Sequence, residues 1–195
     1  MYLAKRDFEK GIETVQALTG LSQEDFDLLQ TVAPQTLPWG EELIASFYNT
    51  LYAYPRTAAI FHKAERGERE ATLIHWYQSL FEVTNVHEFL RNQARIGLAH
   101  VRRDVHNQFM ISAANTLRVH FFNKAVETYG SERGLEIAYA FGRVLDAVIG
   151  LTAEGYELLT RRALSHSTGV KSFLLDHFVH LSIASAEKDL LSQHD

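Results

Sequence analysis

Apolar side chains recur along this chain at intervals of three and four residues, which is the spacing of one face of an α-helix. No stretch alternates apolar and polar residues as a half-buried strand would, and neither Asn-Gly nor Asp-Gly occurs to start a hairpin. The pattern predicts an all-α domain. Helices are expected over residues 6–19, 39–54, 68–83, 86–101, 105–129, 131–164 and 172–191, with a turn or short helix over 58–66.

Residues that begin or end helices support these ranges. Gly20 follows the first helix in the position where a left-handed residue commonly ends one. Ser22 followed by Asp25 resembles a helix start, and it predicts a further short helix that ends before Pro34. Asn85 is placed to cap the helix that follows it.

Composition removes several classes of protein. The 195 residues include no cysteine, which excludes disulfide scaffolds, thiolate zinc sites, iron–sulfur clusters and cysteine nucleophiles. The 19 Lys and Arg against 24 Asp and Glu give a net charge of −5, which argues against nucleic acid and anionic membrane surfaces as partners. No secretion signal is recognisable and no apolar run is long enough for a membrane span, so we expect a cytoplasmic protein.

Common catalytic motifs are also missing. The sequence contains no phosphate-binding loop ending in Gly-Lys-Ser/Thr, no Gly-x-Gly-x-x-Gly, no His-Glu-x-x-His and no Gly-x-Ser-x-Gly. It also lacks the paired Glu-x-x-His motifs that hold two irons in a helical bundle. The motifs therefore leave undecided whether the chain is an enzyme.

Histidine is the abundant side chain with metal-binding chemistry, and the chain has ten of them. His100 differs from the rest because it follows the small and aliphatic residues of 96–99 on a predicted helix. Gly97 stands one turn before it, and the missing side chain there would let a flat ligand approach the helix. The remaining histidines are interpreted as solvated, helix-end, core or chance-paired residues: His62, His75, His87, His106, His120, His166, His177, His180 and His194.

A haem pocket made of helices needs one neutral imidazole as iron ligand, a facing helix and many aromatic and aliphatic side chains around the macrocycle. The chain has 12 Phe and 8 Tyr, and its expected helices equal in number those of the globin fold. Tyr48 lies in an apolar helix, where its hydroxyl requires a polar partner. Together these features favour a haem pocket that includes His100 and Tyr48.

At these two residues the chain resembles the globin-coupled sensor and protoglobin branch of the globins. The segment 96–102, Ile-Gly-Leu-Ala-His-Val-Arg, is similar to the family's proximal-histidine stretch, in which an Arg follows the His two residues later. The segment 46–51, Ser-Phe-Tyr-Asn-Thr-Leu, resembles the family's B helix, whose tyrosine commonly contacts the bound gas. The leading helix matches the extra N-terminal helix of these proteins.

The resemblance covers about residues 20–164, and 72–81 resembles the distal E helix. Two features depart from the family pattern. The family usually continues after its histidine with an Ile-Gly-apolar-Pro turn, where this chain has Arg-Asp-Val-His at 103–106. Counting back from Trp76 puts Arg69 near a distal position where the family more often has leucine. Facing the pocket, Arg69 would bond an anionic ligand or a haem propionate; facing outward, it would meet solvent.

The resemblance implies a globin fold with an extra N-terminal helix and an additional C-terminal helix, holding haem b (iron protoporphyrin IX). His100 would be the iron ligand and Tyr48 the donor to the gas, with Thr72 as a second candidate donor. The expected haem-binding residues are Phe47, Tyr48, Arg69, Thr72, Leu73, Trp76, Ile96, Gly97 and His100.

The implied function is sensing of a diatomic gas, O₂ before CO or NO, with the state of the iron relayed through the helices of a homodimer. The apolar stripe from Leu135 to Leu159 is expected either to form the dimer interface or to pack the core of one chain. Residues 1–164 would be the haem-binding domain, and 165–195 a helical extension that packs on it or leads to a downstream signalling domain or protein. Two other functions stay open: a haem enzyme of the nitric oxide dioxygenase or peroxidase type, and a haem-free interaction module.

Overall fold

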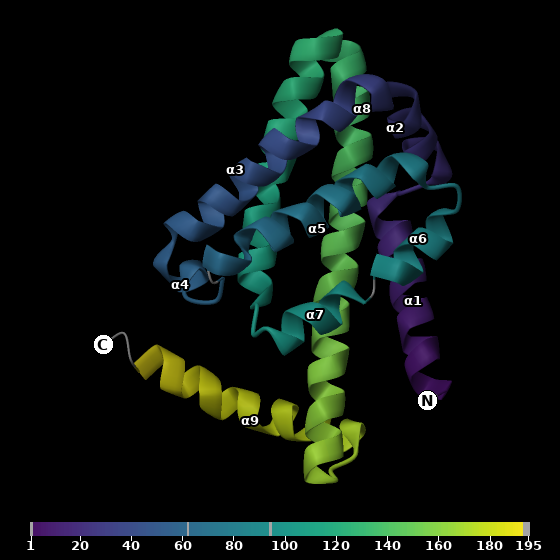
Figure 1. Cartoon of the computed structure of the whole chain (residues 1–195). Coiled ribbons are helices and arrows are strands. Elements are labelled where there is room, and N and C mark those ends of the chain that lie inside the picture. Colours follow the sequence, from purple (N-terminus) through teal and green to yellow (C-terminus); the bar gives the residue numbers. More distant parts are fainter. Residues whose placement is uncertain (1, 62, 94, 193–195) are drawn as a thin grey trace. The chain divides into compact units, whose positions relative to one another are not determined.

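The computed structural model describes residues 2–61, 63–93 and 95–192 of the chain. The regular elements in this part are α-helices and short 3-10 helices, which confirms the expected all-α fold (Figure 1). By their internal contacts the residues divide into two compact units, Met1–Tyr156 and Glu157–Asp195. The boundary between the units falls inside the long helix α8.

The helices differ from the predicted ranges mostly at their ends. For example, α5 begins at Arg66 instead of Glu68 and gives way to a 3-10 helix at Leu80. In chain order the elements are α1 (Tyr2–Thr19), α2 (Gln23–Thr36), η1 (Leu37–Trp39), α3 (Gly40–Ala53), α4 (Pro55–Ala58), η2 (Lys63–Glu65), α5 (Arg66–Ser79), η3 (Leu80–Glu82), α6 (Val86–Gln93), α7 (Ile96–Arg102), α8 (Asn107–Thr168) and α9 (Ser172–Ser192).

The capping residues act as the sequence predicts. Gly20 has a φ of 69° and ends α1. At the start of α2 the backbone N–H of Ser22 donates to Oδ2 of Asp25 at 3.0 Å. At the start of α6 the backbone N–H of Glu88 donates to Oδ1 of Asn85 at 3.0 Å. Each interaction joins residues close in the chain, so the local sequence is enough to predict it.

Pro34 departs from the prediction, whereas Pro55 follows the end of α3 at Ala53, close to the expected end at residue 54. Pro34 lies inside α2, which continues to Thr36 instead of ending before the proline. The missing N–H of Pro34 removes one hydrogen bond near the end of the helix, while the N–H of Leu37 still donates to the carbonyl oxygen of Ala33. Pro55 begins the short helix α4 because its restricted φ suits the first turn of a helix.

The single helix expected over 86–101 is instead two helices, α6 and α7, with a break between Gln93 and Ile96. Phe89 of α6 packs edge-on against Phe26 of α2, with ring centroids 5.0 Å apart. Helix α7 packs against α8. The two halves of the expected helix therefore have different neighbours, and the break lets each face its own.

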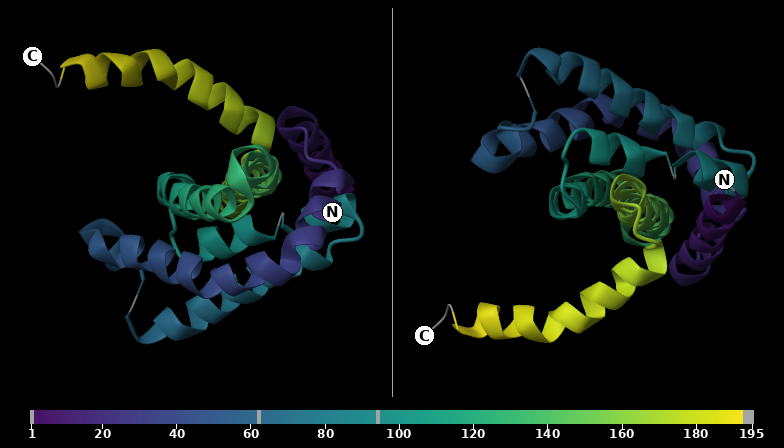
Figure 2. Two further views of the ribbon diagram at one scale, coloured as in Figure 1. Left: turned by 90° about the horizontal axis from the view of Figure 1, so that it is seen from above. Right: turned by 90° about the horizontal axis from the view of Figure 1, so that it is seen from below.

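Gly130 interrupts α8 with a φ of 78° and a ψ of 173°, so the helix consists of two arms, 107–129 and 131–168. Within the first unit the arms lie side by side (Figures 1 and 2). Gly134 permits their close approach, because a Cβ there would lie 2.6 Å from the carbonyl oxygen of Ala125. The break expected between 129 and 131 is confirmed.

Aromatic packing joins the two arms to the N-terminal helices. Phe121 and Phe141, one from each arm, stack with ring centroids 3.9 Å apart, and Trp39 packs edge-on against Phe121 at 5.4 Å. The hydroxyl of Tyr77 on α5 donates to the carbonyl oxygen of Thr36 at 2.6 Å. These contacts tie α2, α5 and α8 into one core.

The apolar stripe of the second arm packs this core. Ala138, Leu145 and Thr152 are buried within the single chain, which is one of the two alternatives expected for the stripe. The other members of the stripe, Leu135, Val148 and Leu159, are half-buried. The large apolar side chains of α8 that stay exposed in the first unit are Ile111, Val119, Phe122 and Tyr139.

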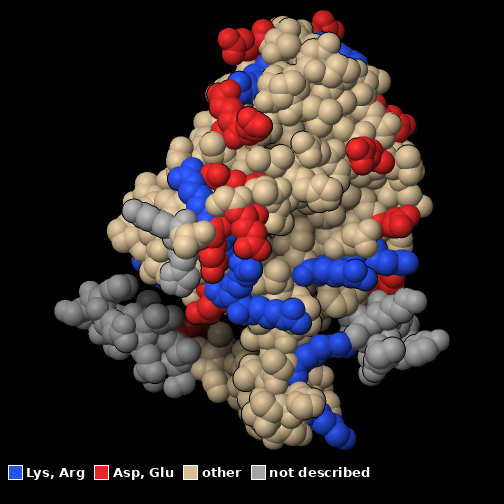
Figure 3. All heavy atoms as spheres, in the orientation of Figure 1, with Lys and Arg blue, Asp and Glu red and all other residues tan. Residues whose placement is uncertain are grey.

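Charged side chains of both signs are interspersed on the face shown in Figure 3. Some of them join separate helices: Arg143 of α8 donates to Oδ1 of Asp25 on α2 at 3.0 Å, and Arg118 of the first arm donates to Oδ2 of Asp146 on the second at 3.1 Å. Of the helices in the described part of the chain, none combines the length and hydropathy needed to cross a membrane.

Candidate functional site

A cavity of about 470 Å³ lies in the first unit between α3, α5, α7 and both arms of α8. An apolar cavity of this size with a few polar groups is the usual form of a cofactor or small-molecule site. Most of its wall consists of apolar side chains, among them Phe47, Leu51, Phe61, Leu73, Phe109 and Leu117.

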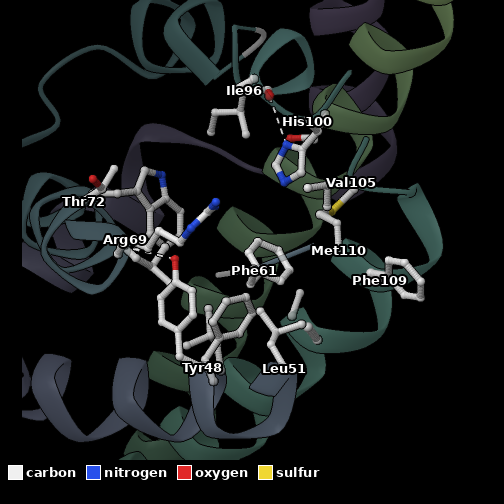
Figure 4. Close-up of a pocket in the computed structure, with 18 of the residues that line it drawn as sticks. Tyr48, Leu51, Phe61, Arg69, Thr72, Ile96, His100, Val105, Phe109 and Met110 are labelled. Carbon is white, nitrogen blue, oxygen red and sulfur yellow. Dashed lines mark hydrogen bonds between the residues drawn. The ribbon is translucent and has the colours of Figure 1, made fainter. Parts of the chain in front are cut away.

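His100 enters this cavity from α7 (Figure 4). Its Nδ1 lies 3.0 Å from the carbonyl oxygen of Ile96. Because a carbonyl only accepts, Nδ1 carries the hydrogen, and Nε2 is directed into the cavity. Burial lowers the pKa of the His100 imidazole, and the bond to Ile96 opposes this only in part. The ring is therefore neutral near pH 7, in the form that binds a metal ion.

The backbone after His100 forms a tight helix end. The N–H of Val105 donates to the carbonyl oxygen of His100 at 3.0 Å, and that of Asp104 to the carbonyl oxygen of Val101 at 3.3 Å. These are the two bonds of a Schellman motif, which requires a left-handed residue. Asp104 supplies it with a φ of 53°. Residues 103–106 depart from the family pattern, but they still end α7 with a residue in the left-handed conformation.

Gly97 does not line the cavity, although the sequence suggested that it opens the helix to a flat ligand. A Cβ at Gly97 would lie 2.8 Å from the carbonyl oxygen of Thr152 and 2.9 Å from the backbone nitrogen of Tyr156. The expectation is corrected accordingly: the missing side chain lets α7 lie directly on the backbone of α8. This contact determines where His100 enters the cavity.

Tyr48 of α3 lies across the cavity from His100 (Figure 4). It is 8% exposed, and its hydroxyl donates to the backbone carbonyl oxygen of Arg69 on α5 at 3.2 Å. Burial raises the pKa of Tyr48 to about 12. The phenol therefore keeps its hydrogen near pH 7 and is a hydrogen-bond donor on the side of the cavity opposite His100.

Two residues of α5 that were expected near the ligand have different placements. The Arg69 guanidinium points into the cavity over the ring of Phe61, 4.8 Å from its centroid, and its Nε donates to Oε2 of Glu65 at 3.1 Å. Thr72 is exposed at the rim, and its hydroxyl donates to the carbonyl oxygen of Glu68 at 2.9 Å. Arg69 offers donors toward the cavity, whereas the hydroxyl hydrogen of Thr72 is used within its own helix.

The α5 wall of the cavity is joined to α6. The indole N–H of Trp76 donates to Oε1 of Gln93 at 2.9 Å, and Gln93 is buried at the end of α6. This bond ties the α5 wall to the segment that leads into α7. Trp76 is one of four further expected residues that line the cavity, namely Phe47, Leu73, Trp76 and Ile96.

Part of the wall is not identified by sequence reasoning. Glu65 and Arg103 at the rim give no sequence signal of their own. The residues of the first arm of α8 do recur at helical spacing, but such spacing does not distinguish a cavity wall from an ordinary core. These residues are Phe109, Met110, Ala113, Ala114 and Leu117.

His100 is the one histidine among the described residues that lines the cavity. His75 is exposed on α5, and Nε2 of His87 lies 3.2 Å from a carboxylate oxygen of Glu9. His62 and His194 lie outside the described residues. Among the residues that the structure covers, no group of three or more His, Cys, Asp or Glu is arranged to hold a metal ion.

A helical unit with one neutral histidine and one tyrosine on opposite sides of an apolar cavity defines a protein of the globin class. The chain belongs to the protoglobin family, whose model, described as Protoglobin, matches residues 8–161. This confirms the resemblance inferred from the segments around Tyr48 and His100. Membership of a globin family implies haem binding.

Two known proteins are also similar to parts of this chain. The structure is similar to the globin domain of the Geobacter sulfurreducens globin-coupled sensor, with a TM-score of 0.67 and 23% sequence identity over 74% of this chain and 96% of that domain. This likeness confirms the globin fold. The chain is also 27% identical over 67 residues to an uncharacterized protein of Methanocaldococcus jannaschii, a match that spans 33% of this chain and 35% of that protein. The matched segment thus spans about a third of that relative's length.

Proposed function

We propose that the protein is a haem-based gas sensor in which His100 is the iron ligand and Tyr48 donates a hydrogen bond to the bound gas. The observation that carries this proposal is the orientation of the His100 ring. Its Nδ1–H is bonded to Ile96, and Nε2 points into an apolar cavity. A half-buried neutral imidazole with one nitrogen facing such a cavity is suited to hold a metal from a single side.

The cavity suits haem b. A volume of about 470 Å³ and a predominantly apolar wall match a large, flat and mostly apolar group. Phe47, Leu73, Trp76 and Ile96 would hold its faces and edges by contact. When bound, the haem supplies an iron that takes O₂, CO or NO reversibly.

Tyr48 provides the polar contact on the gas side. Its bond to the carbonyl oxygen of Arg69, 3.2 Å, is long for a hydroxyl donor. The hydroxyl hydrogen rotates about the C–O bond, so Tyr48 exchanges this weak partner for a ligand in the cavity. A donor there favours O₂ over CO, because O₂ takes on more negative charge than CO when it binds.

Signal transmission would begin at α7. Because Gly97 lies on the backbone of residues 152–156 without a side chain between them, a shift of His100 presses directly on α8. The second arm would carry that shift toward residues 165–195, which we assign as an extension of the sensor domain 1–164 leading to a downstream domain or protein. Such a relay requires that α7 can pack on α8 in two ways. Binding of the gas would then change the free-energy difference between these two packings.

The sensor would act as a cytoplasmic homodimer. The exposed apolar side chains of the first arm recur at helical spacing and so share one face, while Tyr139 comes from the second arm. We assign this face as the contact between copies: Ile111, Val119, Phe122 and Tyr139. Light scattering of wild type and Phe122→Glu tests it, and equal masses for the two proteins would reject this face.

Haem reconstitution of the full chain tests the main proposal. The wild type should show a Soret band, and His100→Ala should lose it or bind haem with altered coordination. His75→Ala is the matched control, because His75 is exposed on α5. A wild type without a Soret band, or a His100→Ala variant with an unchanged spectrum, would reject His100 as the ligand.

The gas-side role has its own test. Tyr48→Phe should raise the O₂ dissociation rate by about tenfold, since one hydrogen bond to a polar ligand is lost, while CO dissociation changes little. Tyr139→Phe, at a tyrosine that is 58% exposed, is the control. An unchanged O₂ rate in Tyr48→Phe would remove Tyr48 from the mechanism.

A further inference from the structure

Arg69 is the most buried of the ion-paired groups at the cavity. Its side chain is 12% exposed, compared with 42% for Glu65 and 53% for Arg103. Figure 3 shows acidic and basic side chains meeting on the surface over α5 and α7. The positive charge of Arg69 therefore lies inside the cavity, and its negative partner lies at the mouth, where water screens it.

The guanidinium of Arg69 is only partly satisfied by the described residues. Nε and Nη2 both donate to the same oxygen of Glu65, and the planar group lies over the ring of Phe61. Nη1 has no hydrogen-bond partner among the described residues, so a guanidinium with five N–H donors has donors available to the cavity. Figure 4 shows the group directed into the space between Tyr48 and His100.

Arg69 also interacts with Tyr48, the residue proposed to contact the gas. The backbone carbonyl of Arg69 accepts the hydrogen bond of Tyr48. The positive charge of the Arg69 side chain lowers the pKa of the Tyr48 phenol, although burial raises that pKa by more. Arg103 lowers it as well. Tyr52 and Glu70 act in the opposite direction, but Arg69 is the charge that acts most strongly on the phenol, so its positive charge dominates near the Tyr48 hydroxyl.

We propose that Arg69 makes the Tyr48 side of the cavity a binding site for small inorganic anions, in addition to neutral diatomic gases. The inference rests on the proposed haem site, because the anion would occupy the same position as the gas. Its partners would be the Arg69 guanidinium, through a charge-assisted hydrogen bond, and the Tyr48 hydroxyl. Glu65 would keep a cationic neighbour when Arg69 turns to the anion, since Nη1 of Arg103 lies 3.9 Å from it.

A haem propionate has the same anionic chemistry and is the competing occupant. The placement favours a small anion, because Arg69 is buried opposite His100 whereas the more exposed Arg103 lies at the mouth, where a propionate would meet water. If Arg69 instead binds a propionate, its removal will weaken haem retention and leave the affinity for an added anion unchanged.

Azide binding to the ferric, haem-loaded chain tests the proposal. Arg69→Leu should weaken azide binding by about tenfold or more and leave CO affinity of the ferrous protein within about threefold. Arg66→Leu is the matched control: it lies on the same helix, pairs with Glu70 at 2.7 Å and stacks over Tyr52, but does not line the cavity.

Each result has a definite meaning. Unchanged azide affinity in Arg69→Leu, or an equal loss in Arg66→Leu, overturns the proposal. Faster haem loss with unchanged azide affinity overturns it in favour of the propionate. A wild type that forms no Soret band rejects the proposed haem site, which is a separate failure.

A second measurement needs no haem. In a Trp39→Phe background Trp76 is the remaining tryptophan of the two in the chain, and it lines the cavity. Iodide should quench its fluorescence more than twofold less in Arg69→Leu, while quenching by neutral acrylamide stays the same. Equal loss of quenching by both agents, or no loss with iodide, overturns the positive potential on which the anion site depends.

Discussion

Gly97 lies directly on the backbone of Thr152, at a distance where a Cβ would be 2.8 Å from the carbonyl oxygen. Real Cβ atoms do not come so close to a backbone oxygen, so any larger residue at this position must move α7 away from α8. The placement of His100 in the cavity thus depends on a contact between residues that are far apart in the sequence.

Gly97→Ala should therefore lower the free energy of unfolding by about 1–3 kcal/mol, as overpacking does in tight cores. Urea unfolding followed by circular dichroism measures this change. Gly67→Ala is the control, because a Cβ at Gly67 meets nothing within 4 Å and alanine is the better helix former. Equal stability of wild type and Gly97→Ala would contradict the close contact.

The side chains of Trp76 and Gln93 should stabilise the fold through the hydrogen bond that joins them. Gln93→Leu leaves the indole N–H without its partner, and Trp76→Phe leaves the buried amide without its own, so each change should cost about 1–3 kcal/mol. The double variant should cost less than the sum of the two. A double-mutant cycle in urea measures this coupling, and strictly additive losses would mean that the bond contributes nothing.

Asp104 holds a left-handed conformation, with a φ of 53°, that glycine adopts without strain. Asp104→Gly should raise the thermal midpoint, with a gain of up to about 1 kcal/mol in unfolding free energy. Asp104→Val should lower it by more, because a β-branched side chain is strained in this conformation. If the valine variant is as stable as the wild type, the helix does not end as described.

Stability should fall in alkaline solution because of Tyr77. The phenol is buried and donates to the carbonyl oxygen of Thr36, and burial raises its pKa far above 10. In the unfolded chain the phenol loses its proton near pH 10, so the unfolded state binds fewer protons there than the folded state. The stabilisation that the protonated, buried phenol provides is complete below pH 10. Above pH 10 it is lost at about 1.4 kcal/mol per pH unit for each such tyrosine.

Urea unfolding between pH 8 and 11.5 measures this slope. Tyr77→Phe should lower stability at pH 8, where the hydrogen bond is lost, but should flatten the decline above pH 10. Tyr48, whose pKa burial raises to about 12, adds to the same decline. Tyr139→Phe is the control, at a tyrosine that is 58% exposed. An identical slope in Tyr77→Phe and wild type would contradict the role of burial.

Local sequence patterns are enough to predict which parts of the chain are helical and where several of the helices end. The roles of Gly20 and Asn85, and the break between the helices 105–129 and 131–164, are predicted correctly because capping and left-handed turns depend on residues a few positions apart. The segments around Tyr48 and His100 also identified the family. Pro34 is the exception, because α2 continues through it to Thr36, and Val32 and Thr36 on either side of it are buried.

The surroundings of the site residues, by contrast, depend on how distant segments pack together. Arg69 and Thr72 are three positions apart on one helix, yet the first points into the cavity and the second uses its hydroxyl within α5. The role of Gly97 depends on residues 152–156, more than fifty positions away in the chain. Helical periodicity determines which residues share a face, whereas the neighbour of that face depends on contacts between distant segments.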